Sequence, residues 1–396
     1  MQTISSKKLL EILVSREIEK QLKEAPVRKS LEIPLPKDLL AISELFKKAG
    51  KKFYLVGGSV RDALMNKEPK DLDIATDAKP DEVVAILKQE PSYKILEIGK
   101  SFGVIKVVTP EKNEYEIATF RKDIGIGRRP DSVEFTDIEQ DSARRDLTIN
   151  ALYYDIENQE IVDYVGGIED ISRGTVRTVG DPDARFNEDR LRLLRAIRFA
   201  GRFGTNLDGA TSEAIKKDNS LAGVSGERIR DEFLKGIKSA KSVPYFLGLI
   251  SEFGLWEQIF PGLQIAASDP KETKNIPVQL ALLLRDNDPK TLLKVLNQLK
   301  YSSDEIAQVV FLVLFHDLSK ENAYRLAKLF VNSKLNKGDL VEFANTIGSP
   351  NKQLLRAFLQ YRPSISGEEL QHQGFSGKAL GQELEKRETE LFSRLI

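Results

Sequence analysis

Asp71 and Asp73 are two acidic residues separated by a single leucine, a pattern that can bind metal ions. On a β-strand their side chains would point to the same face, about 6 to 7 Å apart. Two carboxylates at that separation could hold one or two magnesium ions. Ions of this kind activate an attacking hydroxyl and neutralise a leaving pyrophosphate in phosphoryl transfer. We therefore predict a catalytic metal site at this pair.

The same two carboxylates could instead have a purely structural role. A polar strand edge, or helix-capping carboxylates ahead of Thr76, would account for the pair without a metal. Glu116, on a later expected strand, is a candidate third acidic ligand that would support the site. A solvated strand face accounts for Glu116 equally well, because alternation places polar residues on many strands.

A diglycine turn precedes the aspartates. The apolar run 53–56 predicts a strand, and it is followed by Gly57, Gly58 and, in an expected helix, Arg61. Because glycine has no side chain, backbone N–H groups here could approach a triphosphate closely. The helix start and the forked arginine would both favour phosphate. A Gly-Gly pair alone fits an ordinary tight turn equally well.

Arg145 and Asp146 suit the sugar and phosphates of a nucleotide. An aspartate oxygen can accept a hydrogen bond from a ribose hydroxyl, while an arginine reaches phosphate. This pattern favours a ribonucleotide. A surface salt-bridge cluster at the start of a strand is the alternative.

An acidic pair followed by arginines at steps of three suggests base recognition. We expect this run to be helical, and side chains three residues apart on a helix are neighbours. The residues of the run are Glu188, Asp189, Arg192, Arg195 and Arg198. Asp189 accepts and Arg192 donates, so the two could mimic the edge of a base and select cytosine or adenine without a template. An internal ion-pair ladder is the alternative.

Composition narrows the chemistry. The 60 basic and 60 acidic residues cancel, so RNA binding must come from local basic patches. The chain has no cysteine, which excludes disulfides and cysteine-ligated zinc, and only two histidines, so carboxylates are the natural metal ligands. We expect His316 to be packed in the core. No apolar run reaches the length of about 18 residues that spans a bilayer, so we expect a cytoplasmic protein without membrane contact.

Hydrophobic periodicity predicts an α+β head followed by helices. Residues 1–33 read as an amphipathic helical extension, and residues 34–163 as a head with helices and a small mixed sheet, including strands near 103–108 and 115–120. Helical patterns then predict an all-α neck over 164–240 and an all-α body and tail over 241–396.

Five segments between residues 50 and 240 follow one another in a recognisable order. They are Gly57-Gly58-x-x-Arg61-Asp62 with Asp71-x-Asp73, Arg144-Arg145-Asp146-Leu-Thr-Ile-Asn150, Asp163-Tyr-Val-Gly166-Gly167, Glu188-Asp189-x-x-Arg192 and Glu227-Arg228-Ile-Arg-Asp-Glu232. Together they resemble the motifs of the class II tRNA nucleotidyltransferase and bacterial poly(A) polymerase family, within the polymerase β superfamily. In that order they resemble its catalytic, ribose-selecting, hinge, base-selecting and neck-stabilising motifs.

The resemblance implies a polymerase β-like nucleotidyltransferase head and template-independent addition of CCA to the 3′ end of tRNA. The substrates would be CTP and ATP, the cofactor Mg²⁺ with two ions during catalysis, and the second product pyrophosphate. It implies that Asn150 joins Arg145 and Asp146 in binding the nucleotide. Arg195 and Arg198 would reach the nucleotide or its phosphates, with Glu188 orienting Arg192. No obligatory protein partner is evident.

The segment 121–135 resembles the flexible loop of the family, and the resemblance implies that a loop of this full length favours terminal A addition. Gly166 and Gly167 could form a hinge or a plain turn between domains. The main rivals are a bacterial poly(A) polymerase and a dedicated A-adding enzyme, since they share these motifs. A more remote rival is an inactive RNA-binding protein on the same fold.

Overall fold

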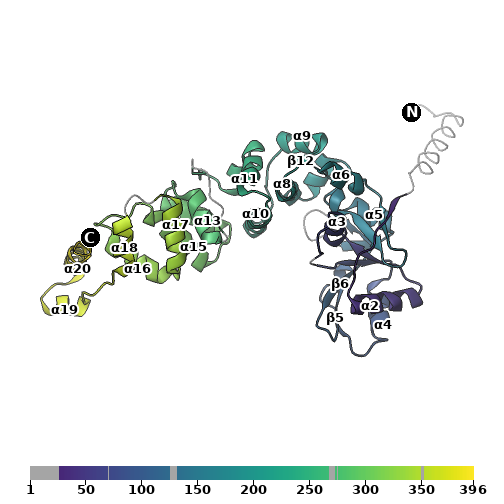
Figure 1. Ribbon diagram of the computed structural model, residues 1–396, viewed down its shortest axis with the longest axis horizontal. Coiled ribbons are helices and arrows are strands. Elements are labelled where there is room, and N and C mark those ends of the chain that lie inside the picture. The colour runs from purple at the N-terminus through teal and green to yellow at the C-terminus, as the bar shows by residue number, and fades with distance from the viewer. Residues whose placement is uncertain (1–25, 70, 125–131, 267–272, 274, 349–351) are drawn as a thin grey trace, which may run out of the picture. The chain divides into compact units, whose positions relative to one another are not determined.

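The computed structural model describes residues 26–69, 71–124, 132–266, 273, 275–348 and 352–396 (Figure 1). The chain divides into two units, one of residues 1–192 with 205–214 and the other of residues 193–204 with 215–396. Helix α8 (Leu191–Phe203) and helix α9 (Gly209–Lys217) each run across this division. None of the described helices is long and apolar enough to cross a membrane.

A mixed eight-stranded sheet forms the centre of the first unit. Only β3 and β6 pair in parallel among its neighbouring strands, and the other neighbours are antiparallel. The strands in spatial order are β1 (Val27–Ser30), β10 (Glu160–Asp163), β9 (Leu152–Asp155), β2 (Phe53–Val56), β3 (Ile74–Thr76), β6 (Glu114–Thr119), β5 (Val104–Val108) and β4 (Lys94–Leu96).

Helices α2 (Lys37–Lys48) and α4 (Pro80–Leu87) pack against each other and against this sheet (Figure 1). Their apolar sides join Leu55 and Ile117 in one buried cluster, in which both residues are fully buried. Burial of an aliphatic side chain of this size contributes about 1.5 to 3 kcal/mol. The cluster therefore fixes the strand that leads into the glycine turn.

A second buried cluster forms around three aromatic residues. Tyr54, Phe120 and Tyr153 lie with ring centroids 6.1 to 6.3 Å apart. A two-stranded hairpin, β7 (Arg121–Ile124) with β8 (Ser132–Phe135), and helix α5 (Ile138–Ala143) follow Phe120 along the chain. The expected flexible loop begins and ends on this hairpin, and its residues 125–131 lie outside the described part of the chain.

The rest of the first unit continues from the sheet into short elements. These are the 3₁₀ turns η1 (Lys100–Phe102) and η2 (Thr148–Asn150), the helices α3 (Gly58–Leu64), α6 (Gly167–Arg173) and α7 (Pro182–Glu188), and the parallel pair β11 (Thr175–Val176) and β12 (Asn206–Leu207). An isolated bridge between Leu147 and Thr178 ties the expected ribose motif to the chain that enters α7.

The second unit is helical throughout the residues described. After the end of α8 and α9 it contains α10 (Gly226–Ser239), α11 (Val243–Glu252), α12 (Leu255–Ile259), α13 (Ile276–Leu284), α14 (Pro289–Gln298), α15 (Ser303–Phe315), α16 (Ala323–Ser333), α17 (Lys337–Thr346), α18 (Lys352–Gln360), α19 (Gly367–His372) and α20 (Gly377–Ser393). Polar caps fix several helix starts. At α15, Ser302 and Glu305 form a reciprocal capping box.

The expected fold class, an α+β nucleotidyltransferase head followed by helices, is confirmed. The helix expected over residues 1–33 is wrong at its end, because Val27–Ser30 is strand β1, paired with β10. A helix that continued through Pro26 would lose a backbone hydrogen bond, and the open edge of β10 supplies backbone partners to Val27–Ser30. Residues 1–25, which carry the rest of that prediction, lie outside the described residues.

His316 is exposed at the end of α15, so the expectation that it packs in the core is wrong. The core-facing side of this helix includes Leu312 and Phe315. His316 is one residue further on, about 100° around the helix, where the chain turns away.

Candidate active site

The glycine turn between β2 and α3 has a conformation that only glycine adopts easily. Gly57 has φ +75° and ψ −122°. Its N–H donates to the Leu152 carbonyl at 3.0 Å, and its carbonyl accepts from the Arg61 N–H at 3.1 Å. The turn brings the start of α3, at Gly58, to the end of β2. The first N–H groups of a helix have no acceptor within that helix.

Arg61 is buried within this motif, with 4% of its surface exposed. Its Nε and Nη2 donate to Asp62 at 2.9 and 2.8 Å, and its Nη1 donates to Asn150. The guanidinium therefore ties α3 to the η2 turn. A direct contact between Arg61 and a phosphate stays a prediction.

Asp71 and Asp73 lie just before β3, which begins at Ile74. The strand alternation that we expected for the pair therefore does not extend to it. The Asp73 carbonyl still accepts from the Val56 N–H at 3.0 Å, which holds Asp73 beside the end of β2. Both aspartates line a hollow of about 620 Å³ together with Lys106 and Glu116.

The charges around Asp73 suit a bound cation. Although the Asp73 side chain is exposed, partial desolvation raises its pKa, the negative charges of Glu116 and Asp71 raise it further, and Arg145 lowers it. A divalent cation would relieve this repulsion, and carboxylate oxygens are hard ligands that suit magnesium. Lys106 is an ion-pair partner of Glu116, at 3.4 Å.

No group of three acidic or histidine side chains in the described ranges could hold a metal ion by itself. Magnesium in nucleotide-handling enzymes is commonly held by one or two carboxylates together with substrate phosphates and water. Asp71 and Asp73 fit that arrangement.

Arg145 and Asn150 lie next to the glycine turn. A side chain at Gly57 would meet the Asn150 carbonyl at 3.6 Å and the Arg145 Nη1 at 3.7 Å. Asn150 also donates to Asp146 at 3.3 Å. The fold thus brings the expected ribose motif to the expected phosphate turn.

Asp141 organises this motif, and our sequence reasoning missed it. Its carboxylate is 1% exposed and accepts from four donors: the Arg121 N–H at 3.1 Å, Arg144 Nε at 2.9 Å, Arg145 Nη2 at 3.0 Å and Tyr153 Oη at 2.5 Å. Burial opposes its ionisation, but these partners outweigh burial and lower the pKa of Asp141 to about 2. The available signal was spacing, because Asp141 lies three and four residues before Arg144 and Arg145.

The expected base-selecting motif is not one continuous helix. Helix α7 ends at Glu188, Asp189 is extended with φ −152°, and α8 begins at Leu191. The Asp189 side chain accepts from the Leu191 N–H at 3.2 Å, and an aspartate that caps a new helix start explains the break. Asp189 and Arg192 remain close, because the Arg192 N–H donates to the Asp189 carbonyl at 3.0 Å.

The Arg192 guanidinium is held from two sides. Its Nη1 donates to Glu188 Oε2 at 2.6 Å, and its Nη2 donates to the Arg144 carbonyl at 3.2 Å. The same Glu188 oxygen accepts from Arg185 at 2.8 Å, and Arg185 was also missed. The orienting role of Glu188 stays a prediction, because the same Arg192–Glu188 ion pair would also occur in an ion-pair ladder.

Known proteins match this chain along most of its length. The family described as "Poly A polymerase head domain" matches residues 53–177, and "Probable RNA and SrmB- binding site of polymerase A" matches residues 204–266. A CCA-adding enzyme of Lactobacillus helveticus is 36% identical over 78% of this chain and 79% of its own length. The chain belongs to the CCA-adding enzyme family.

Other members of the CCA-adding enzyme family match to different extents. The Bacillus pumilus CCA-adding enzyme is 44% identical, but the match spans only about half of each protein, 54% of this chain and 52% of the relative. The crystal structure of Bacillus stearothermophilus CCA-adding enzyme in complex with CTP has a TM-score of 0.66 at 26% identity, covering 90% of this chain and 93% of that one. The family resemblance of the sequence motifs is thereby confirmed.

In this member of the CCA-adding enzyme family, Arg195 and Arg198 belong to the second unit, where both contact Glu232 of α10. Arg198 Nε donates to Glu232, and Arg195 Nη1 lies 4.0 Å from it. Arg198 also stacks on Phe199, with its guanidinium carbon 4.0 Å from the ring centroid. Glu232 is 3% exposed, so two arginines balance a buried charge. A contact of either arginine with nucleotide stays a prediction.

The glycine pair expected at the hinge is needed for packing. Gly166 has φ +82°, and a side chain at Gly167 would lie 2.2 Å from the Thr148 carbonyl oxygen. Asp163 accepts from the N–H groups of Val165, Gly166 and Ile168 at 2.8 to 2.9 Å. These contacts explain both glycines without requiring motion.

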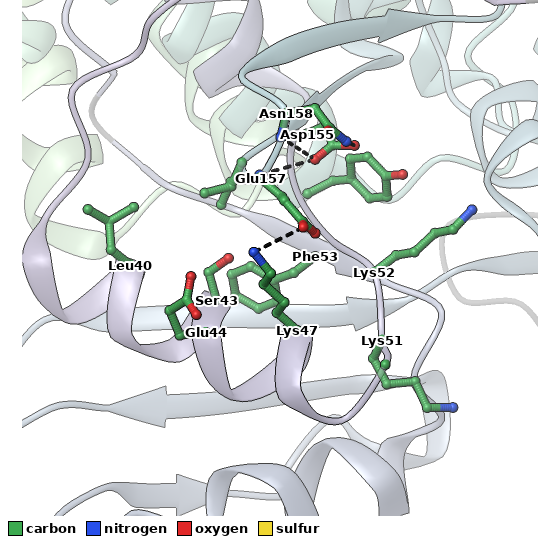
Figure 2. A pocket seen from close by; sticks show the side chains of 13 residues that line it. Leu40, Ser43, Glu44, Lys47, Lys51, Lys52, Phe53, Asp155, Glu157 and Asn158 are labelled. Atoms are coloured by element: carbon green, nitrogen blue, oxygen red, sulfur yellow. Dashed lines mark hydrogen bonds and ion pairs between the residues drawn. The ribbon is translucent and has the colours of Figure 1, made fainter.

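A pocket of about 500 Å³ lies at the other end of β2 from Gly57. In this pocket Lys47 forms an ion pair with Glu157 at 3.0 Å, while Lys51 and Lys52 extend away from this pair (Figure 2). Its lining contains none of the residues predicted to bind metal or nucleotide. We therefore place the candidate active site of this family member at the Gly57 end of β2, despite the hollow at the opposite end.

Proposed function

We propose that this chain is a template-independent nucleotidyltransferase that adds C, C and A to the 3′ end of tRNA from CTP and ATP. One observation carries the proposal: the Asp73 carbonyl accepts from the Val56 N–H at 3.0 Å, beside the Gly57 turn, and a side chain at Gly57 would meet Arg145 Nη1 at 3.7 Å. Carboxylates for a cation and a guanidinium for phosphate therefore meet at one turn. The names of relatives, and a CCA-adding enzyme solved with CTP, support the same reaction.

The chemistry is an in-line phosphoryl transfer. The tRNA 3′-hydroxyl oxygen bonds to the α-phosphorus of the nucleotide, and the bond to pyrophosphate breaks, without a covalent enzyme intermediate. Magnesium, with two ions during catalysis, supplies charge neutralisation and hydroxyl activation when it is bound. Asp71 and Asp73 would hold the magnesium. Glu116 would support the site, because its negative charge acts on Asp73.

The nucleotide would be read by three groups of residues. The Gly58 N–H at the start of α3, with Arg145, would bind the triphosphate, Gly57 would allow the close approach because it has no side chain, and Arg195 and Arg198 would help there. Asp146 and Asn150 would bind the sugar. Asp189 and Arg192 would read the base, one accepting and the other donating. Arg61 would act by holding Asn150, with which it is hydrogen bonded.

We assign these functions to the regions expected from sequence. Residues 34–163 would form the catalytic head, 164–240 the neck that selects the base, and 241–396 the body and tail that bind tRNA. We propose that the protein works in the cytoplasm on tRNA without a protein partner.

A bacterial poly(A) polymerase or an A-adding enzyme is the rival, because one matched region is named after the poly(A) polymerase head. The test is an incorporation assay with magnesium and labelled CTP or ATP on tRNAs that lack A, CA or CCA. Addition of C, C and then A, followed by a stop, is expected. Addition of A alone, or of a long A tail, would favour the rivals. Binding of tRNA without any incorporation would favour an inactive RNA-binding protein.

A further inference from the structure

The Asp141 carboxylate connects three segments of the first unit. Its four donors come from the start of β7, from the Arg144-Arg145 pair and from β9, and Asp141 itself lies within α5. Charge-assisted hydrogen bonds to a buried carboxylate are short and directional. Asp141 therefore restrains both arginines at once.

These two arginines lead to opposite sides of the candidate site. Arg145 extends to the Gly57 turn and acts on the charge of Asp73, which is the phosphate and metal side. Arg144 presents its backbone carbonyl to Arg192 Nη2 at 3.2 Å, which is the base side. Arg144 and Arg145 are consecutive in the chain, and Asp141 accepts from both of their side chains, so Asp141 restrains both sides together.

Tyr153 completes the connection. Its hydroxyl donates to Asp141 at 2.5 Å and accepts from Arg145 Nε at 3.0 Å, while the Arg145 guanidinium lies 5.2 Å from its ring centroid. Arg145 is thus fixed by a carboxylate, a hydroxyl and an aromatic face. A side chain held in this way keeps one position when the nucleotide arrives.

We propose that Asp141 is a positioning residue that holds Arg145 and Arg192 in a common geometry, so that the phosphates and the base of one nucleotide are read together. This inference rests on the proposed function of the site. It predicts that loss of the Asp141 charge weakens base selection, although Asp141 itself contacts neither base nor phosphate.

The experiment is a double-mutant cycle with Asp141→Asn and Arg192→Lys. The readouts are kcat and KM for CTP and ATP, misincorporation of UTP and GTP, and the equilibrium Kd for CTP without turnover. We expect Asp141→Asn to lower discrimination about tenfold. We also expect the effect of Arg192→Lys to shrink about tenfold in the Asp141→Asn background, because coupled residues are not additive.

Asp38→Asn is the matched control. Asp38 is also a buried carboxylate of the first unit with four donors: the Leu39 N–H, Thr109, Asn113 and Tyr115 at 2.7 to 3.0 Å. Asp38→Asn should lower the Tm but leave discrimination unchanged. In the double variant with Arg192→Lys, the fold-changes of the two single variants should simply multiply. Tyr153→Phe should shift discrimination several-fold in the same direction as Asp141→Asn, which keeps the test decisive if Asp141→Asn fails to fold.

The proposal is overturned if Asp141→Asn and Tyr153→Phe leave discrimination and the Kd for CTP within twofold of wild type, or if the cycle with Arg192→Lys is multiplicative. Failure of the proposed function is a different result. The wild-type protein would then incorporate neither CTP nor ATP, and the cycle measured on the Kd for CTP would still test the positioning role.

Discussion

The Arg192 guanidinium donates a hydrogen bond to the backbone carbonyl of Arg144 at 3.2 Å. The two residues are 48 positions apart in sequence. The contact joins the segment that we propose reads the base to the segment that we propose reads the sugar and phosphates. A second contact, between Arg192 and Glu188 at 2.6 Å, fixes the other end of the guanidinium.

Glu188→Gln should reduce base discrimination by about tenfold, because a charged hydrogen bond contributes about 1.5 to 3 kcal/mol and partial exposure weakens this one. The change removes the charge that both Arg185 and Arg192 share. Competition between CTP, ATP and UTP on tRNA lacking CCA measures it. Glu169→Gln, which breaks the exposed pair of Glu169 with Arg173, is the control. Equal effects of the two changes would contradict the orienting role.

Asp189→Ala should relax base choice by about fivefold to a hundredfold, the range in which a lost bidentate contact to a base falls. The rate with the correct nucleotide should fall less than the discrimination. Asn187→Ala, two residues earlier and exposed, should leave both unchanged. Unaltered preference in Asp189→Ala would indicate that Asp189 serves only to cap α8.

Asp73→Asn should lower incorporation of both CTP and ATP by about a thousandfold or more, since a bound metal contributes several kcal/mol of charge stabilisation. Binding of tRNA, measured by filter retention, should persist. Asp77→Asn, an exposed change four residues later, is the control. Chelation of divalent ions should abolish activity in the wild type. Substantial turnover by Asp73→Asn would refute the metal assignment.

Gly167→Ala should destabilise the protein by about 1 to 3 kcal/mol, because its new methyl group would lie 2.2 Å from the Thr148 carbonyl oxygen. A calorimetric Tm measures the effect. Gly381→Ala in α20 has open space around it and should leave the Tm unchanged or raise it. If Gly167→Ala kept its Tm and lost only activity, a hinge role would be favoured over packing.

Acid should weaken the first unit partly through Asp141. Burial opposes ionisation, but Arg145 and the other partners lower the pKa of Asp141 from 3.8 to about 2. The unfolded chain therefore takes up this proton at a higher pH than the folded chain, and the stabilisation present above about pH 4 is lost as the pH falls towards about 2. The difference in unfolding free energy between wild type and Asp141→Asn should shrink by about 2 kcal/mol across that range. A constant difference, measured by calorimetry at several pH values, would contradict the assignment.

Much of the candidate site and of the fold class could be predicted from the amino-acid sequence. Gly57 and Gly58 after an apolar run, the pair Asp71 and Asp73, and the motif order were enough to predict the head, its helical continuation and the family. These signals are local, because glycine freedom, hydrophobic period and charge spacing act within a few residues of the chain.

The partners of each charged side chain, in contrast, became known from the folded structure. Arg61 is directed to Asn150, 89 residues away, and is buried, whereas Asp141 is the shared partner of Arg144, Arg145 and Tyr153. Asp189 breaks a helix that periodicity alone would continue, and Val27–Ser30 becomes a strand because β10 offers an open edge. Burial and long-range hydrogen bonds depend on which segments meet, and a single sequence does not record those meetings.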